Sequence, residues 1–102
     1  MSMSRGQMRQ FQKMQERLMK AQAEIVAKTV EATAGGGAVK VTVSGDMKVK
    51  SLEISPEVVD AEDVEMLEDL VTAAVNEALE EMQKYQTEQM AGLTGGLGFP
   101  TR

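Results

Sequence analysis

The chain has 102 residues and contains neither cysteine nor histidine, which excludes disulfides, thiol chemistry and the usual proton carrier at neutral pH. Hydrophobic residues make up 42% of the sequence and aromatic residues only 3%, so we expect one domain with an aliphatic, methionine-rich core. The net charge of −5 argues against a nucleic-acid partner, but residues 1–50 carry nine basic and four acidic residues, while residues 51–102 carry two and twelve.

Residues 8 to about 26 predict a long amphipathic helix. Its apolar residues recur at alternating spacings of three and four, a seam of period 3.5: Phe11, Met14, Leu18, Ala21 and Ile25. The opposite side collects five basic residues within about 120°: Arg5, Arg9, Lys13, Arg17 and Lys20. This basic face fits either a solvated helix surface or a row of cations that follows a phosphate backbone.

After this helix the hydrophobic period falls to two, which is typical of β-strands. We expect three strands: Thr29–Ala34, Val39–Val43 and Met47–Ile54. A glycine loop at residues 35–37 separates the first two, and Gly45 as the first central residue of the next turn favours a two-residue type II′ hairpin. The alternation shifts near Lys50 and Ser51, which either a β-bulge or burial on both faces would explain.

A second long helix follows the strands, with Asp60 as its expected N-cap and an end near Gln89. The glycine- and proline-rich residues 91–102 predict a flexible tail, so residues 1–90 form the single domain. The expected fold class is therefore α+β, with a long helix, a three-stranded antiparallel sheet and a second long helix in that order (α-β-β-β-α).

The helices are too long for the sheet to cover. Helices of about 20 and 28 residues extend about 30 and 42 Å, whereas a strand of six residues spans about 20 Å. The uncovered apolar surface predicts a symmetric partner, and hence a homodimer. The residues expected to form this dimer or core seam are Phe11, Met14, Leu18, Ile25, Leu67, Leu70, Val71 and Ala74.

No catalytic assembly is visible in the sequence, so an enzyme is not expected. The glycines at 35–37 lack the Lys-Ser/Thr of a phosphate-binding loop, and the acidic residues between Asp60 and Asp69 lack the spacing of a calcium loop. Neither a metal site nor a cofactor is therefore expected. No apolar stretch is long enough for a signal peptide or a membrane span, which favours a cytoplasmic protein.

Four segments in the same order resemble the YbaB/EbfC family of nucleoid-associated proteins over residues 8 to about 90. They are Met8–Gln22, Val39–Gly45, Val49–Glu57 and Glu65–Ala78. The resemblance implies an intertwined or tweezer-like homodimer with protruding helices. It also implies a protein of the bacterial nucleoid that binds double-stranded DNA with little sequence specificity.

The family has no signature that fixes its DNA contacts, so the charge pattern selects the candidates. The first helix supplies Arg5, Arg9, Lys13, Arg17 and Lys20, and the strands supply the weaker candidates Lys40, Lys48 and Lys50. The alternative is a coiled-coil-like adaptor that binds a protein partner through Met14 and Leu18 and never contacts DNA.

Overall fold

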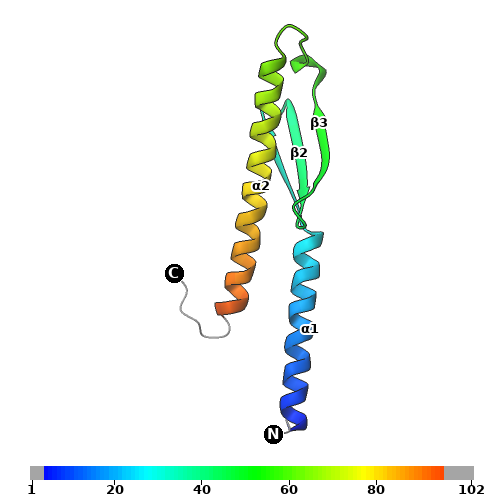
Figure 1. The fold of residues 1–102 in the computed structure, drawn as a ribbon, viewed down its shortest axis with the longest axis vertical. Helices are drawn as coiled ribbons and strands as arrows, with labels where there is room; N and C mark the ends of the chain where they lie inside the picture. The colour runs from blue at the N-terminus through cyan, green and yellow to red at the C-terminus, as the bar shows by residue number, and fades with distance from the viewer. Residues whose placement is uncertain (1–3, 96–102) are drawn as a thin grey trace.

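The computed structural model describes residues 4–95 and has the α-β-β-β-α order predicted from the sequence (Figure 1). The elements are α1 (Arg5–Ala27), β1 (Thr29–Ala34), β2 (Val39–Ser44), β3 (Val49–Ile54), a short 3₁₀ turn η1 (Pro56–Val58) and α2 (Val64–Gly95). The strands form one antiparallel sheet in the order β1-β2-β3, so β2 lies in the centre.

Local hydrogen bonds place the start of α1 earlier than predicted. The Ser4 side chain accepts the backbone N–H of Gln7 at 3.2 Å, and the Gln7 side chain accepts the backbone N–H of Ser4 at 3.0 Å. This reciprocal capping box satisfies two N–H groups that a helix start leaves unpaired. The helix therefore begins at Arg5, not at residue 8.

The prediction of Asp60 as the cap of α2 is wrong. A carboxylate oxygen of Asp63 accepts the N–H of Met66 at 3.2 Å, which makes Asp63 the residue that caps α2. Asp60 instead accepts the N–H of Glu62 at 2.9 Å in the preceding turn. At its other end α2 includes residues 91–95, the first part of the predicted tail, and residues 96–102 lie outside the described residues.

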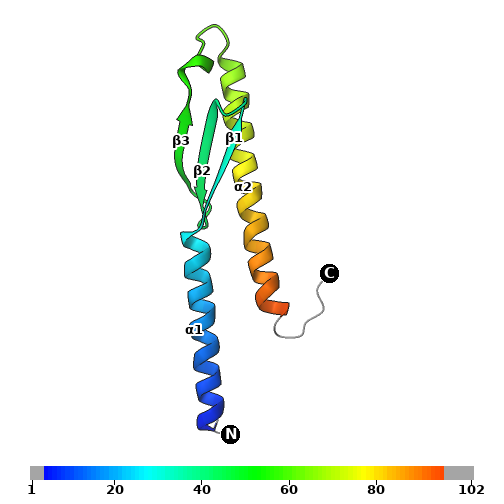
Figure 2. The same ribbon diagram turned by 180° about the vertical axis from the view of Figure 1, so that it is seen from behind.

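The core lies between α2 and one face of the sheet. Val39, Val41 and Val43 of β2 are completely buried, since they alternate with polar residues and all point to the same side. They pack on a stripe of α2 formed by Ala74, Ala78 and Met82, each of which is also completely buried. Two alanines in this stripe let the helix approach the sheet closely. Figures 1 and 2 show α2 running along β1 and β2.

A β-bulge explains the shifted alternation in β3. Ile54 lies opposite Val39 and Leu52 opposite Val41, but Val43 lies opposite Val49, so the register shifts. One extra residue in β3 therefore turns Val49, Leu52 and Ile54 toward the same face as the buried valines of β2. The alternative of burial on both faces is excluded, because every residue of β3 is exposed.

The turn between β2 and β3 is not the predicted type II′ turn. That turn requires a positive φ at Gly45, whereas the positive φ of 62° belongs to Met47. Ser44 N–H donates to the carbonyl of Lys48 at 2.9 Å, which closes a three-residue loop. The Ser44 hydroxyl donates to the Asp46 carboxylate and is the main reason why the pKa of Asp46 lies below its ordinary value.

Replacing Met82 with alanine tests this core. Met82 is completely buried, so we expect Met82→Ala to lower the free energy of unfolding by about 2–5 kcal/mol through lost contacts and a new cavity. The matched control is Met19→Ala, because the Met19 side chain is 70% exposed and its loss is expected to cost less than about 0.5 kcal/mol. Equal effects of the two substitutions in urea titrations would contradict the assigned core.

Candidate nucleic-acid interface

The α1 helix extends away from the sheet as an arm. The molecule measures 72 × 26 × 19 Å and has a radius of gyration of 20.2 Å, against about 13 Å for a compact chain of this length. No residue of α1 is buried. Only Ala21 and Ile25, near the sheet, are partly covered. The other residues of the helix are exposed, and Figure 1 shows α1 extending beyond the end of the sheet.

The five candidate cations of α1 are all exposed on this arm. They share one side of the helix, together with Glu16 and Glu24, so the side carries a net charge of +3. Within residues 4–95, no acidic group lies within ion-pair distance of any of the five. Their charge is therefore available to an anionic partner.

The three weaker candidates belong to other elements than α1, namely β2, β3 and the turn between them. Lys40 pairs with Glu53 at 3.6 Å, and Lys48 pairs with Asp46 at 3.8 Å. Both pairs are largely exposed and contribute little to stability, but each neutralises part of the local positive charge. Lys50 is exposed in β3. The structure therefore brings the five α1 residues together on one helix, while these three belong to other elements and two of them are engaged in ion pairs.

The predicted dimer or core seam divides into two groups. Ala74 is buried in the core, and Leu67, Leu70 and Val71 are partly buried residues that pack against it. Phe11, Met14 and Leu18 are 54%, 47% and 46% exposed along the arm, and Ile25 is half-buried at its base. The α2 part of the seam thus belongs to the monomer core, while most of the α1 part stays exposed among the residues that the structure describes.

The base of α1 contacts both the β2–β3 turn and α2. Gly45 donates its N–H to the carbonyl of Lys28 at 2.9 Å, and the Gln86 side-chain amide donates to the carbonyl of Gly45. The Lys28 ammonium lies 5.2 Å from the centre of the Tyr85 ring, within cation–π range. Sequence reasoning missed this cluster, because its residues come from three distant segments and have no common motif.

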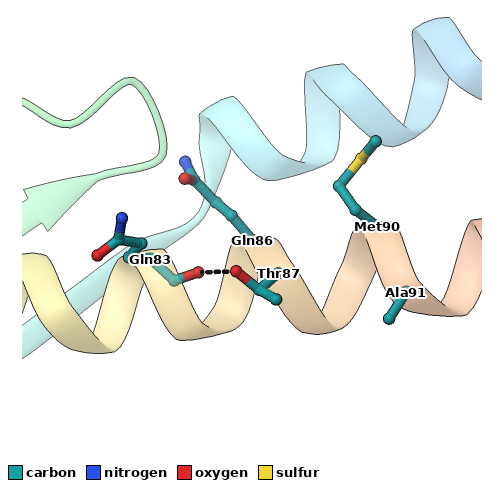
Figure 3. Close-up of a pocket in the computed structure, with 5 residues that line it drawn as sticks. All are labelled: Gln83, Gln86, Thr87, Met90 and Ala91. Carbon is teal, nitrogen blue, oxygen red and sulfur yellow. Dashed lines mark hydrogen bonds between the residues drawn. The ribbon is translucent and has the colours of Figure 1, made fainter. Parts of the chain in front are cut away.

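An open pocket of about 530 Å³ lies along the last turns of α2. It is lined by Gln83, Gln86, Thr87, Met90 and Ala91. Figure 3 shows the Gln86 and Met90 side chains pointing toward α1. The Thr87 hydroxyl donates to the carbonyl of Gln83 at 2.9 Å. None of the lining side chains titrates near neutral pH, so the pocket offers no acid or base for catalysis.

Known proteins identify the family of the chain. Residues 1–97 match the YbaB/EbfC DNA-binding family. The chain belongs to this family. Its YbaB/EbfC relatives include a nucleoid-associated protein of Alkaliphilus metalliredigens, 54% identical over 91% of this chain and 82% of the relative. A nucleoid-associated protein of Syntrophobacter fumaroxidans is 45% identical over 98% of this chain and 93% of the relative.

The same fold occurs in a crystal structure of an uncharacterised protein from Helicobacter pylori. The two structures have a TM-score of 0.73 at 17% sequence identity, and the match covers 91% of this chain and 99% of the other. At that identity the likeness concerns the fold alone. Within residues 4–95 of this YbaB/EbfC protein, no helix is both long enough and apolar enough to cross a lipid bilayer.

Hydrogen exchange tests whether α1 is free in solution. Because α1 buries no residue, we expect its backbone amides to exchange faster than those of α2 between residues 74 and 82, which pack on the sheet. Mass spectrometry of the full chain without DNA measures both segments in one sample. Equal protection of the two segments would mean that another surface covers α1 in solution.

Proposed function

We propose that this YbaB/EbfC protein is a nucleoid-associated homodimer that binds duplex DNA with little sequence specificity through the basic face of α1. The observation that carries the proposal is the row of five exposed cations on a helix that buries none of its residues, none of them in an ion pair with a residue between 4 and 95. The names of its relatives support the nucleoid as its location, since they are nucleoid-associated proteins of bacteria.

The spacing of the cations suits a phosphate backbone. From Arg5 to Lys20 the helix rises about 22 Å, which equals the axial rise of about six base pairs of a DNA duplex. Contacts to phosphate position a protein on the duplex but carry no direct sequence information. Long, flexible Lys and Arg side chains on an exposed face therefore favour binding that is weakly specific and strongly dependent on salt.

The acidic residues of α2 do not oppose this mode of binding. The half-buried residues of α1, Ala21 and Ile25, belong to its apolar seam, so the seam side turns toward the rest of the molecule. The basic face lies opposite the seam and points away from α2, which carries seven acidic residues and one lysine. DNA that approaches α1 from its basic side avoids the strongest repulsion from α2.

The inner face of β3 supports the homodimer. Val49, Leu52 and Ile54 are 50%, 44% and 36% exposed, although each lies opposite a completely buried valine of β2. Apolar side chains on the core side of a sheet are normally covered, and α2 covers only β1 and β2. A second copy of the chain is the simplest cover, and it would give the assembly two basic arms.

Neutralising the arm tests the DNA contact. We expect the triple variant Arg9→Gln, Lys13→Gln and Arg17→Gln to bind a labelled random duplex much more weakly. Because six phosphate contacts per dimer are lost, the slope of log K against log salt concentration is expected to flatten by about five. Fluorescence anisotropy at several salt concentrations measures both quantities.

A control with the same charge change separates local contact from overall charge. Thr72→Glu, Asn76→Asp and Gln83→Glu also lower the charge by three, but on exposed positions of α2, and are expected to weaken binding far less. Unchanged DNA binding by the triple variant of α1 would exclude the basic face of α1 as the DNA contact. If the wild-type chain binds no duplex even at low salt, the DNA-binding function is excluded and the alternative remains, an adaptor that binds a protein partner through Met14 and Leu18.

A charge on the inner face of β3 tests the homodimer. We expect Leu52→Lys to shift the protein from dimer to monomer, because a lysine there would place an unpaired ammonium in the proposed interface. Its neighbour Ser51 lies on the opposite face of the sheet, so Ser51→Lys is expected to leave the dimer intact. Sedimentation at micromolar concentration distinguishes the species, and dimerisation of both variants would rule out this face.

A further inference from the structure

We propose that Gly45, Lys28, Tyr85 and Gln86 form a joint that fixes the direction of α1 and so positions its basic face for DNA. The inference rests on the proposed function, since it assigns these four residues a positioning role in the same DNA-binding arm. It gives Gly45 a role unrelated to turn geometry. The supporting observations are one steric constraint and three polar contacts, all at the base of α1.

The steric constraint is the contact between Gly45 and the backbone of α1. A Cβ atom at Gly45 would lie 1.6 Å from the carbonyl oxygen of Ile25 and 2.8 Å from the Cα atom of Val26. Both obstacles are main-chain atoms, so no side-chain rotation relieves the clash. The φ of Gly45 is not positive, so the turn itself does not require glycine. Glycine is therefore required here because α1 passes directly over the turn.

Three polar contacts hold the same point from different directions. The Gly45 N–H binds the carbonyl of Lys28, which ties the turn to the residue that ends α1. The carbonyl of Gly45 accepts the Gln86 amide, which ties the turn to α2. The Lys28 ammonium lies over the Tyr85 ring, which ties the end of α1 to α2 directly. Three segments thus meet at one buried glycine.

The position of the joint amplifies small changes. To make room for a Cβ atom, the Ile25 carbonyl has to move by about 1.4 Å, from 1.6 Å to the 3.0 Å below which real contacts essentially never occur. Ile25 lies about 4.5 Å along the helix from Lys28, whereas Gln12 lies about 24 Å from it. If α1 pivots at Lys28, the displacement at Gln12 becomes about 7 Å. The basic arm then changes direction while its own sequence stays intact.

The two arms of a dimer make this direction important for affinity. Two sites on one rigid body bind the same duplex together only when their geometry permits simultaneous contact. When the two arms cannot contact the duplex at the same time, the dimer loses the increase in affinity that comes from joining two sites, commonly about 10²-fold or more. A displaced joint is therefore expected to weaken DNA binding to that extent, although every cation of α1 remains.

The test measures arm direction and DNA affinity in the same variants. The chain contains no cysteine, so Gln12→Cys and Asn76→Cys accept spin labels at two known positions only. Labelled chains diluted with unlabelled chains report the distance from α1 to α2 within one subunit. In this background we expect Gly45→Ala to shift or broaden the distance by about 7 Å, with anisotropy on a 30-base-pair random duplex showing about 10²-fold weaker binding.

Two further comparisons separate positioning from general loss of structure. Gly92→Ala is the matched control, because a Cβ atom there meets nothing within 4 Å, and it is expected to change neither readout. Tyr85→Leu removes the cation–π contact without changing charge and is expected to shift the distance, whereas Tyr85→Phe keeps the ring and restores the wild-type distance. If Gly45→Ala fails to fold, the two Tyr85 variants test the joint in its place. Circular dichroism measures the helix content of every variant.

The outcomes distinguish failure of the joint from failure of the proposed function. Unchanged distances in both Gly45→Ala and Tyr85→Leu would overturn the joint, whatever happens to DNA binding. A shifted distance with unchanged affinity would overturn its role in positioning the basic face. A wild-type chain that binds no duplex would overturn the proposed function, while a shifted distance would still support the joint as the element that directs α1.

Discussion

The width of one α-helix is the constraint on which this structure depends. A helix with its side chains is about 10 Å across, and strands lie about 4.8 Å apart, so one helix covers about two strands of a sheet. Here α2 covers β1 and β2 and stops short of β3. The apolar face of β3 remains exposed, and α1 is left without a surface on which to pack. The incomplete core and the free arm therefore have the same cause.

A helix that buries none of its residues needs other sources of stability. The 23 residues of α1 exceed the length of about 15 at which isolated helices become marginal. Most of them are Gln, Met, Lys, Arg, Glu or Ala, which have high helix propensity, and the capping box of Ser4 and Gln7 fixes the first turn. Local interactions thus maintain α1, while α2 depends mainly on its contacts with the sheet.

The sequence predicted those features that depend on local periodicity. The strand Thr29–Ala34 has the predicted bounds, and the order of elements is as expected, because periods of two and of three to four are visible without tertiary information. The cap of α2 was misplaced, since Asp60 and Asp63 both precede acidic and apolar residues and offer the same chemistry. Only the hydrogen bonds identify the residue that caps the helix.

Features that depend on contact between distant segments were beyond sequence reasoning. The sequence predicts a type II′ turn at Gly45, which is the usual explanation for glycine there, but the space for a Cβ atom is lost only because the fold brings this turn against Ile25 at the end of α1. The bulge in β3 could be identified only from the pairing register between β3 and β2. The spacing of apolar residues could not predict that Ala74 is buried and Leu18 exposed, because both helices have the same spacing of three and four residues.

The absence of buried residues in α1 also affects how the protein can evolve. Substitutions in a packed core are selected against because they destabilise the fold, whereas exposed positions generally tolerate change within about 0.5 kcal/mol. Along α1 nearly every position is of the second kind. Lineages can therefore gain or lose positive charges on this helix one at a time, adjusting how strongly the arm attracts anions with little cost to folding. The sheet and α2 do not have the same freedom.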